Sequence, residues 1–208
     1  MRRRRPTISI ARAVEVFETM VDLRRRYCGD KEFFTMIDVF EILCDEDLNG
    51  SEDVWRIKTF STNLKEEYRR KVGVITFDGN VTLSMDQRFL DKARQGCNLC
   101  NYTLAHEFGH LALEHHNSNA KIMNFQLFDG QSGNSNLPPN SVELEANYAA
   151  VFFQCGDALT DDSMTSIQLA RRSYSDFLYV KKAQKIVRLP EFQRILNRPK
   201  PQYPRILL

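Results

Sequence analysis

The sequence predicts an α+β fold, in which a helical bundle packs on a small, mainly antiparallel sheet. Apolar residues recur at helical spacing in both halves of the chain, and short β-rich runs lie between them. The 208 residues are enough for one domain with a sizeable core. We expect a single domain over residues 9–195, preceded by a basic arm at 1–8 and followed by an extended proline-rich tail at 196–208.

Helices are expected near both ends of this domain. The first runs from Ser9 to Tyr27, where arginines gather at the C-terminal end, as the helix dipole favours. The second runs from about Lys31 to Cys44. Helical patterns return at 163–174 and 176–187, and Pro190 is expected to end regular structure.

Strands are expected in the middle of the chain, at 54–60, 72–77 and 81–85. Asp78-Gly79 separates the last two, and this dipeptide is a strong signal for a two-residue hairpin turn. The last two strands should therefore pair antiparallel.

The composition is typical of a globular protein and not of a membrane protein. The net charge is +2, with 42% hydrophobic and 27% charged residues, as in ordinary globular proteins. No apolar run approaches the roughly 20 residues that span a membrane, and Arg2 to Arg5 is not followed by the apolar segment of a signal peptide. We therefore expect a cytoplasmic protein with no membrane contact. Direct nucleic-acid binding is not expected, and the arginine arm is interpreted as a solvated tail.

The five cysteines give no sign of a disulfide framework, because their number is odd and their spacing irregular. Cys97 and Cys100 form a lone CxxC pair, which is half of a zinc knuckle or a redox couple. A chance pair is the favoured interpretation.

The strongest chemical signal is His106-Glu107-x-x-His110. Residues four apart lie on one face of a helix, so both imidazoles can bind one zinc ion, and Glu107 is placed to take a proton from a water at that ion. The run contains no proline, and its apolar stripe predicts a buried helix: Leu104, Phe108, Leu111 and Ala112. The alternative is a core helix with two hydrogen-bonded histidines.

A third protein ligand is needed, and His116 is one candidate because it follows His106 by ten residues. That long pattern requires a glycine at position 113 to break the helix, whereas this chain has Leu113. In a continuous helix His116 would lie about 15 Å along the axis from His106, too far to share a metal.

A second helix beginning near Ser141 offers better candidates. Glu143 shares a stripe with the small residues Ala146 and Ala150, which would let this helix approach Gly109 closely. Glu145 lies about 200° away around the axis, so only one glutamate can face the metal, and the stripe favours Glu143. The alternative, a solvated carboxylate at a helix start, is favoured for Glu145.

Thr103–His115 resembles the active helix of the ImmA/IrrE-type metallopeptidases. Glu143–Ala150 is similar to their second signature, Glu-x-Glu-Ala-Asn-x-x-Ala. Gly73–Ser84 resembles the strand pair that precedes the zinc helix in this family, and Leu169–Ser175 is similar to a late helical segment of the family. The resemblance covers roughly residues 30–190.

This resemblance implies a zinc-dependent endopeptidase with one zinc per chain, for which Mn²⁺ and Fe²⁺ are alternatives. It makes His106, His110 and Glu143 the metal ligands and Glu107 the general base. It also implies a protein substrate, a helix-turn-helix repressor that binds DNA. The chain departs from the family beyond the ligands, with Phe-Phe-Gln-Cys-Gly at 152–156 in place of a Leu-Leu-Met-Pro stretch.

Several nearby side chains are candidates for supporting roles. Asn147, or a nearby backbone carbonyl, is expected to orient one of the histidine ligands through a hydrogen bond. His115, His116, Tyr102 and Tyr148 are candidate donors to the transition state, and the sequence does not choose among them.

Two other functions remain open. The chain could be a non-proteolytic, metal-containing module that sequesters a partner protein, although this role would not require Glu107. It could also be a nucleic-acid-associated regulator that acts through residues 2–5, in which case binding would depend steeply on salt.

Overall fold

The computed structural model describes residues 7–45, 54–61, 73–77, 80–115 and 141–198. Within these residues the protein is mostly helical with one small sheet, so the expected α+β class is confirmed. The Asp78-Gly79 turn, His116, most of the basic arm and the end of the tail lie outside the described residues. None of the described helices is long and apolar enough to cross a membrane.

Local caps set where the first two helices begin. Helix α1 (Ile10–Cys28) follows Ser9, whose side chain accepts a hydrogen bond from the Arg12 amide. Helix α2 (Met36–Cys44) starts later than expected, because Thr35 and Asp38 form a reciprocal capping box there.

The sheet is mixed, so the expected mainly antiparallel sheet was wrong. Its strands are β1 (Val54–Phe60), β2 (Gly73–Phe77) and β3 (Asn80–Asp86), in the order β1-β3-β2. Strands β2 and β3 pair antiparallel, as the hairpin signal indicated, but β1 pairs parallel to the central strand β3 over its whole length. A turn signal reports only on neighbouring strands, and it carries no information about this longer-range pairing.

A short helix that was not expected, α4 (Gln87–Arg94), connects the sheet to the central helix. Asp86 ends β3 and caps α4, because its carboxylate accepts a hydrogen bond from the Arg88 amide. The Arg88 side chain also bonds this carboxylate, which keeps the buried charge paired.

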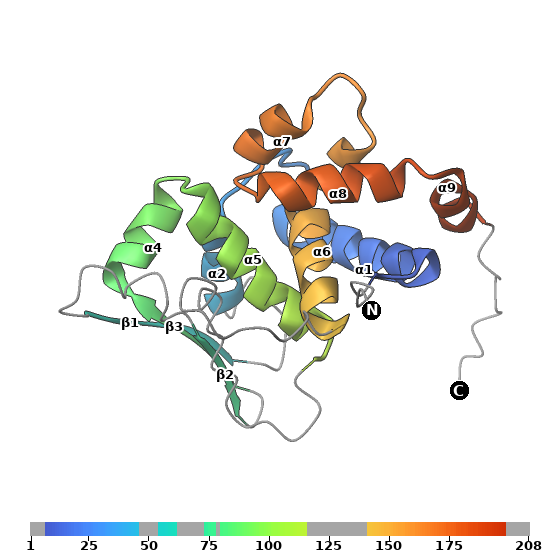
Figure 1. The fold of residues 1–208 in the computed structure, drawn as a ribbon. Helices are drawn as coiled ribbons and strands as arrows, with labels where there is room; N and C mark the ends of the chain where they lie inside the picture. The colour runs from blue at the N-terminus through green and yellow to red at the C-terminus, as the bar shows by residue number, and fades with distance from the viewer. Residues whose placement is uncertain (1–6, 46–53, 62–72, 78–79, 116–140, 199–208) are drawn as a thin grey trace, which may run out of the picture.

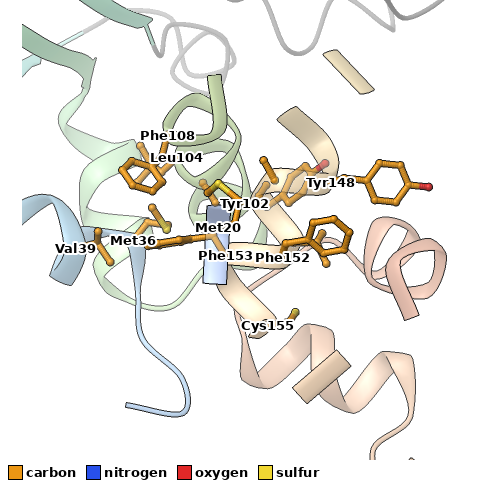
Figure 2. Close-up of a cluster of buried hydrophobic side chains, with 14 of the residues drawn as sticks. Met20, Met36, Val39, Tyr102, Leu104, Phe108, Tyr148, Phe152, Phe153 and Cys155 are labelled. Atoms are coloured by element: carbon orange, nitrogen blue, oxygen red, sulfur yellow. The ribbon is translucent and has the colours of Figure 1, made fainter. Parts of the chain in front are cut away.

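The core is built around two helices, α5 (Asn98–Ala112) and α6 (Ser141–Cys155), which lie side by side in Figure 1. Aromatic side chains from both helices meet there, with Phe108 and Phe153 in ring contact at 4.7 Å. Figure 2 shows these side chains with Met20 of α1 and Met36 of α2 in one cluster. This packing buries the part of α5 that carries the histidine motif.

Gly109 is the point of closest approach between α5 and α6. A Cβ atom at this position would lie 2.9 Å from the Ala149 Cβ and 3.2 Å from the Ala146 carbonyl oxygen. Of the two small residues expected to allow this approach, Ala146 lies at the contact, whereas the other nearest residue is Ala149 and not Ala150. The contact holds the start of α6 over the histidines.

Replacing Gly109 with alanine should destabilise the protein. The added methyl group overpacks the contact with α6, at a typical cost of about 1–3 kcal/mol, and this outweighs the gain in helix propensity of about 1 kcal/mol. Chemical denaturation should give a lower unfolding midpoint for Gly109→Ala than for the wild type. An unchanged or higher midpoint would show that the helices can separate without cost.

The C-terminal segment has four short elements: the 3₁₀ turn η3 (Gly156–Leu159) and helices α7 (Ser166–Arg172), α8 (Phe177–Val187) and α9 (Pro190–Leu196). Of these, η3 and α8 pack on α6, α7 packs on α8, and α9 packs on α1. Pro190 was expected to end regular structure, and this was wrong. It occupies the first turn of α9, where its fixed φ is favourable and its missing amide proton is not needed. Phe192 of α9 then packs edge-on against Phe17 of α1.

Candidate metal centre

Helix α5 places two histidines side by side in the protein interior. His106 and His110 are one turn apart and both are buried, and their Nε2 atoms lie 3.0 Å from each other. Burial lowers the pKa of His110, and contact with Glu143 opposes this only in part. Neutral imidazole is the form that binds metal ions.

Helix α6 brings Glu143 to the same point. Its carboxylate oxygens lie 3.3 Å from Nε2 of His106 and 3.6 Å from Nε2 of His110. The three ligand atoms all fall within 4.8 Å of one another, so His106, His110 and Glu143 form a group that could hold a metal ion. Hydrogen bonding to His106 and then to His110 holds the pKa of Glu143 well below its usual range, so its carboxylate is ionised.

The surroundings of the Glu107 carboxylate show whether this group of residues fits a metal ion. Its side chain is buried, at 1% exposure, and neither carboxylate oxygen has a hydrogen-bond partner among the described residues. Burial, followed by the negative charge of Glu143, raises its pKa well above the usual value. A buried carboxylate without donors is costly. A cation and a water molecule beside it would remove that cost, so the arrangement fits a metal centre.

This pKa shift predicts how the stability of the metal-free protein depends on pH. Below the ordinary glutamate pKa of 4.5, Glu107 is protonated in both the folded and unfolded states and costs nothing. As pH rises above 4.5, the unfolded chain ionises more readily than the folded one, and stability is lost until the raised folded pKa is reached. Glu107→Gln removes this ionisation.

The melting temperature of metal-free Glu107→Gln should therefore exceed that of the wild type by a margin that grows as pH rises from 4.5. Thermal melts at several pH values measure the margin, with Glu15→Gln as the control, because the Glu15 side chain is exposed on α1. If the difference in melting temperature is the same at every pH, the pKa of Glu107 is not raised in the folded protein.

The end of α5 differs from the expected continuous helix. The helix stops at Ala112 although position 113 is leucine, because Glu114 adopts a left-handed conformation with φ of 54°. The Glu114 amide bonds the Leu111 carbonyl and the His115 amide bonds the His110 carbonyl, which is a Schellman turn without glycine. The turn brings the His115 ring back against His110, with their Nδ1 atoms 3.0 Å apart.

Glu145 was expected to be a solvated carboxylate, and this was wrong. Its side chain is only 19% exposed and accepts two hydrogen bonds from the Arg12 guanidinium, at 2.8 and 3.0 Å. Its Oε2 atom also lies 3.5 Å from Nε2 of His115. Glu145 thus faces away from the metal group, as the helical geometry required, but toward other parts of the protein.

Asn147, Tyr148 and Tyr102 were also candidates for supporting roles, and each lies in a different environment. Asn147 donates to the Glu143 carbonyl at 2.6 Å and accepts from the Tyr102 hydroxyl, so it fastens the start of α6 to α5. Tyr148 is buried between Phe152 and Tyr179, where burial raises its pKa to about 12. The Tyr102 ring lies 6.5 Å from the His106 ring.

Arg12 is the residue near the site that the sequence did not reveal. It lies on α1, 133 positions before Glu145, and its segment was interpreted only as an amphipathic helix. Nothing in the local pattern distinguishes Arg12 from a solvated arginine on an exposed helix face.

Comparison with known proteins adds no family assignment: the chain matches no protein-family model, and no curated protein matches it. The resemblance to the ImmA/IrrE-type metallopeptidases therefore rests on the sequence signatures quoted above. Independently of that resemblance, the fold brings together two histidines and a carboxylate that could hold a metal ion, and the buried Glu107 next to His106 in the sequence has no hydrogen-bond partner among the described residues.

Proposed function

We propose that this protein is a zinc-dependent endopeptidase. The observation that carries the proposal is the buried carboxylate of Glu107, which has no hydrogen-bond partner among the described residues and follows directly on the first of three convergent ligands. A site that only bound metal would have no need for a costly buried carboxylate at this position. A hydrolytic site needs a base there.

Each side chain has a defined role in this proposal. His106, His110 and Glu143 hold the metal and leave a coordination position for the substrate. When bound, zinc would polarise the scissile carbonyl and lower the pKa of a water molecule in the site. Glu107 accepts a proton from the attacking water and delivers it to the leaving amine nitrogen.

The proposed substrate is a helix-turn-helix transcriptional repressor in the cytoplasm. Two sequence signatures, Thr103–His115 and Glu143–Ala150, support this substrate class through their resemblance to the ImmA/IrrE-type metallopeptidases. Mn²⁺ and Fe²⁺ are alternative metals, because the two imidazoles and one carboxylate also suit them.

A cleavage assay tests the proposal. A candidate helix-turn-helix repressor is incubated with about one hundredth of its amount of zinc-loaded enzyme, and its fragments are followed on a gel. We expect complete cleavage over many turnovers, loss of cleavage with a chelator and recovery on adding zinc. Tight binding of the intact repressor in a stoichiometric complex would instead support the sequestering module.

A further inference from the structure

A chain of polar contacts leads from the back of His110 to helix α1. The His110 Nδ1 atom, on the side of the ring away from the metal group, lies 3.0 Å from Nδ1 of His115. On the other side of the His115 ring, Nε2 lies 3.5 Å from Oε2 of Glu145. The same Glu145 oxygen accepts both hydrogen bonds from Arg12.

The chemistry of these groups allows one proton arrangement along the chain if His110 binds a metal. Binding through Nε2 requires a lone pair there, so the ring proton must be on Nδ1. His115 must then accept that proton with a bare Nδ1 and carry its own proton on Nε2. This proton faces the Glu145 carboxylate at 3.5 Å, and Arg12, which only donates, holds the same carboxylate oxygen with two hydrogen bonds.

The protein holds these groups in place from three separate elements. Arg12 comes from α1, Glu145 from α6 and His115 from the turn after α5. At this turn Glu114 adopts a left-handed backbone conformation. This conformation costs energy, because only glycine adopts it routinely without strain. The side chain of His115 is 7% exposed, so it packs in the interior and not on the surface.

We propose that His115, Glu145 and Arg12 form a positioning chain that fixes the tautomer and orientation of His110 for metal binding. The inference rests on the metal centre of the proposed function and does not depend on proteolysis. Such partners of a metal-bound histidine typically contribute about 10- to 100-fold to metal affinity.

Paired substitutions at His115 test the chain. His115→Phe keeps a ring of similar shape but removes the acceptor, and zinc affinity should fall about 10- to 100-fold. His115→Asn returns an acceptor oxygen near the former Nδ1 position, and it should recover much of the affinity. Competition with a chromophoric chelator measures both values, and thermal melts check that each variant folds.

Substitutions at Glu145 and at Glu15 provide a second test of the positioning chain and a control. Glu145→Gln keeps the shape but weakens the preference for a proton on Nε2 of His115, so zinc affinity should also fall. Glu15→Gln removes the other carboxylate bound to Arg12, which is exposed and lies outside the chain. This control should leave zinc affinity unchanged.

A spectroscopic measurement tests the proton arrangement without metal. In the metal-free wild type, ring ¹⁵N chemical shifts should show His110 protonated on Nδ1, and His115→Phe should give a mixture of tautomers. The inference is overturned if His110 carries its proton on Nε2, or if His115→Phe and Glu145→Gln bind zinc within about threefold of the wild type. A failure of the proposed function would look different, with the expected losses of zinc affinity but no cleavage.

Discussion

His106→Ala and His110→Ala should each lower zinc affinity about 100- to 1,000-fold. Zinc sites with four ligands bind with about 10–16 kcal/mol, so one ligand contributes roughly 2.5–4 kcal/mol, and each 1.4 kcal/mol is a factor of ten. Each change removes the whole imidazole ring and therefore one of the two nitrogen ligands. Glu143→Ala should have an effect of similar size.

Elemental analysis after dialysis and chelator competition measure these losses. The informative comparison is Glu143→Ala against Glu145→Gln, because the two residues lie on opposite sides of the same helical turn. Glu143→Ala should lose far more affinity, since Glu145 acts only through His115. Stoichiometric zinc in the double variant His106→Ala/His110→Ala would rule out this metal site.

Glu107→Gln should reduce peptide cleavage by about 100-fold or more while leaving zinc binding nearly intact. Glutamine has nearly the same shape but cannot accept a proton, and positioned acid–base groups typically contribute 10²- to 10⁴-fold. Glu107 contributes no metal ligand in the group of His106, His110 and Glu143, so the metal should stay. Without metal, the same variant is expected to be more stable than the wild type at neutral pH, which separates a loss of chemistry from a loss of fold.

This prediction is measured as initial rates of repressor cleavage by zinc-loaded wild type and Glu107→Gln. Elemental analysis of both preparations confirms equal zinc content. Equal rates would remove Glu107 from the mechanism. A variant that loses its zinc would instead make Glu107 a structural part of the metal group.

Local features of the fold and site were predictable because their causes are local. Both histidines follow from four-residue spacing on one helix, and the antiparallel pairing of β2 with β3 follows from one turn dipeptide. Helical geometry separates Glu143 and Glu145 by about 200°, so only one of them could face the metal, and the stripe of alanines favoured Glu143. The structure places Glu143 in the metal group.

Features that depend on distant residues were not predictable. The parallel pairing of β1 with β3 is set by tertiary packing and leaves no mark on either strand. The contact of Glu145 with Arg12 joins residues 133 positions apart. At the end of α5, glycine was taken as necessary for a turn that Glu114 in fact makes, because packing can hold a non-glycine residue in a left-handed conformation.

The central claim is that His106, His110 and Glu143 hold one metal ion. Anomalous diffraction at the zinc edge, from crystals of the zinc-loaded protein, tests it most directly. We expect a single strong peak about 2.0–2.2 Å from Nε2 of both histidines and from a carboxylate oxygen of Glu143. No peak between these side chains, or a peak about 2.3 Å from the sulfurs of Cys97 and Cys100, would contradict the account.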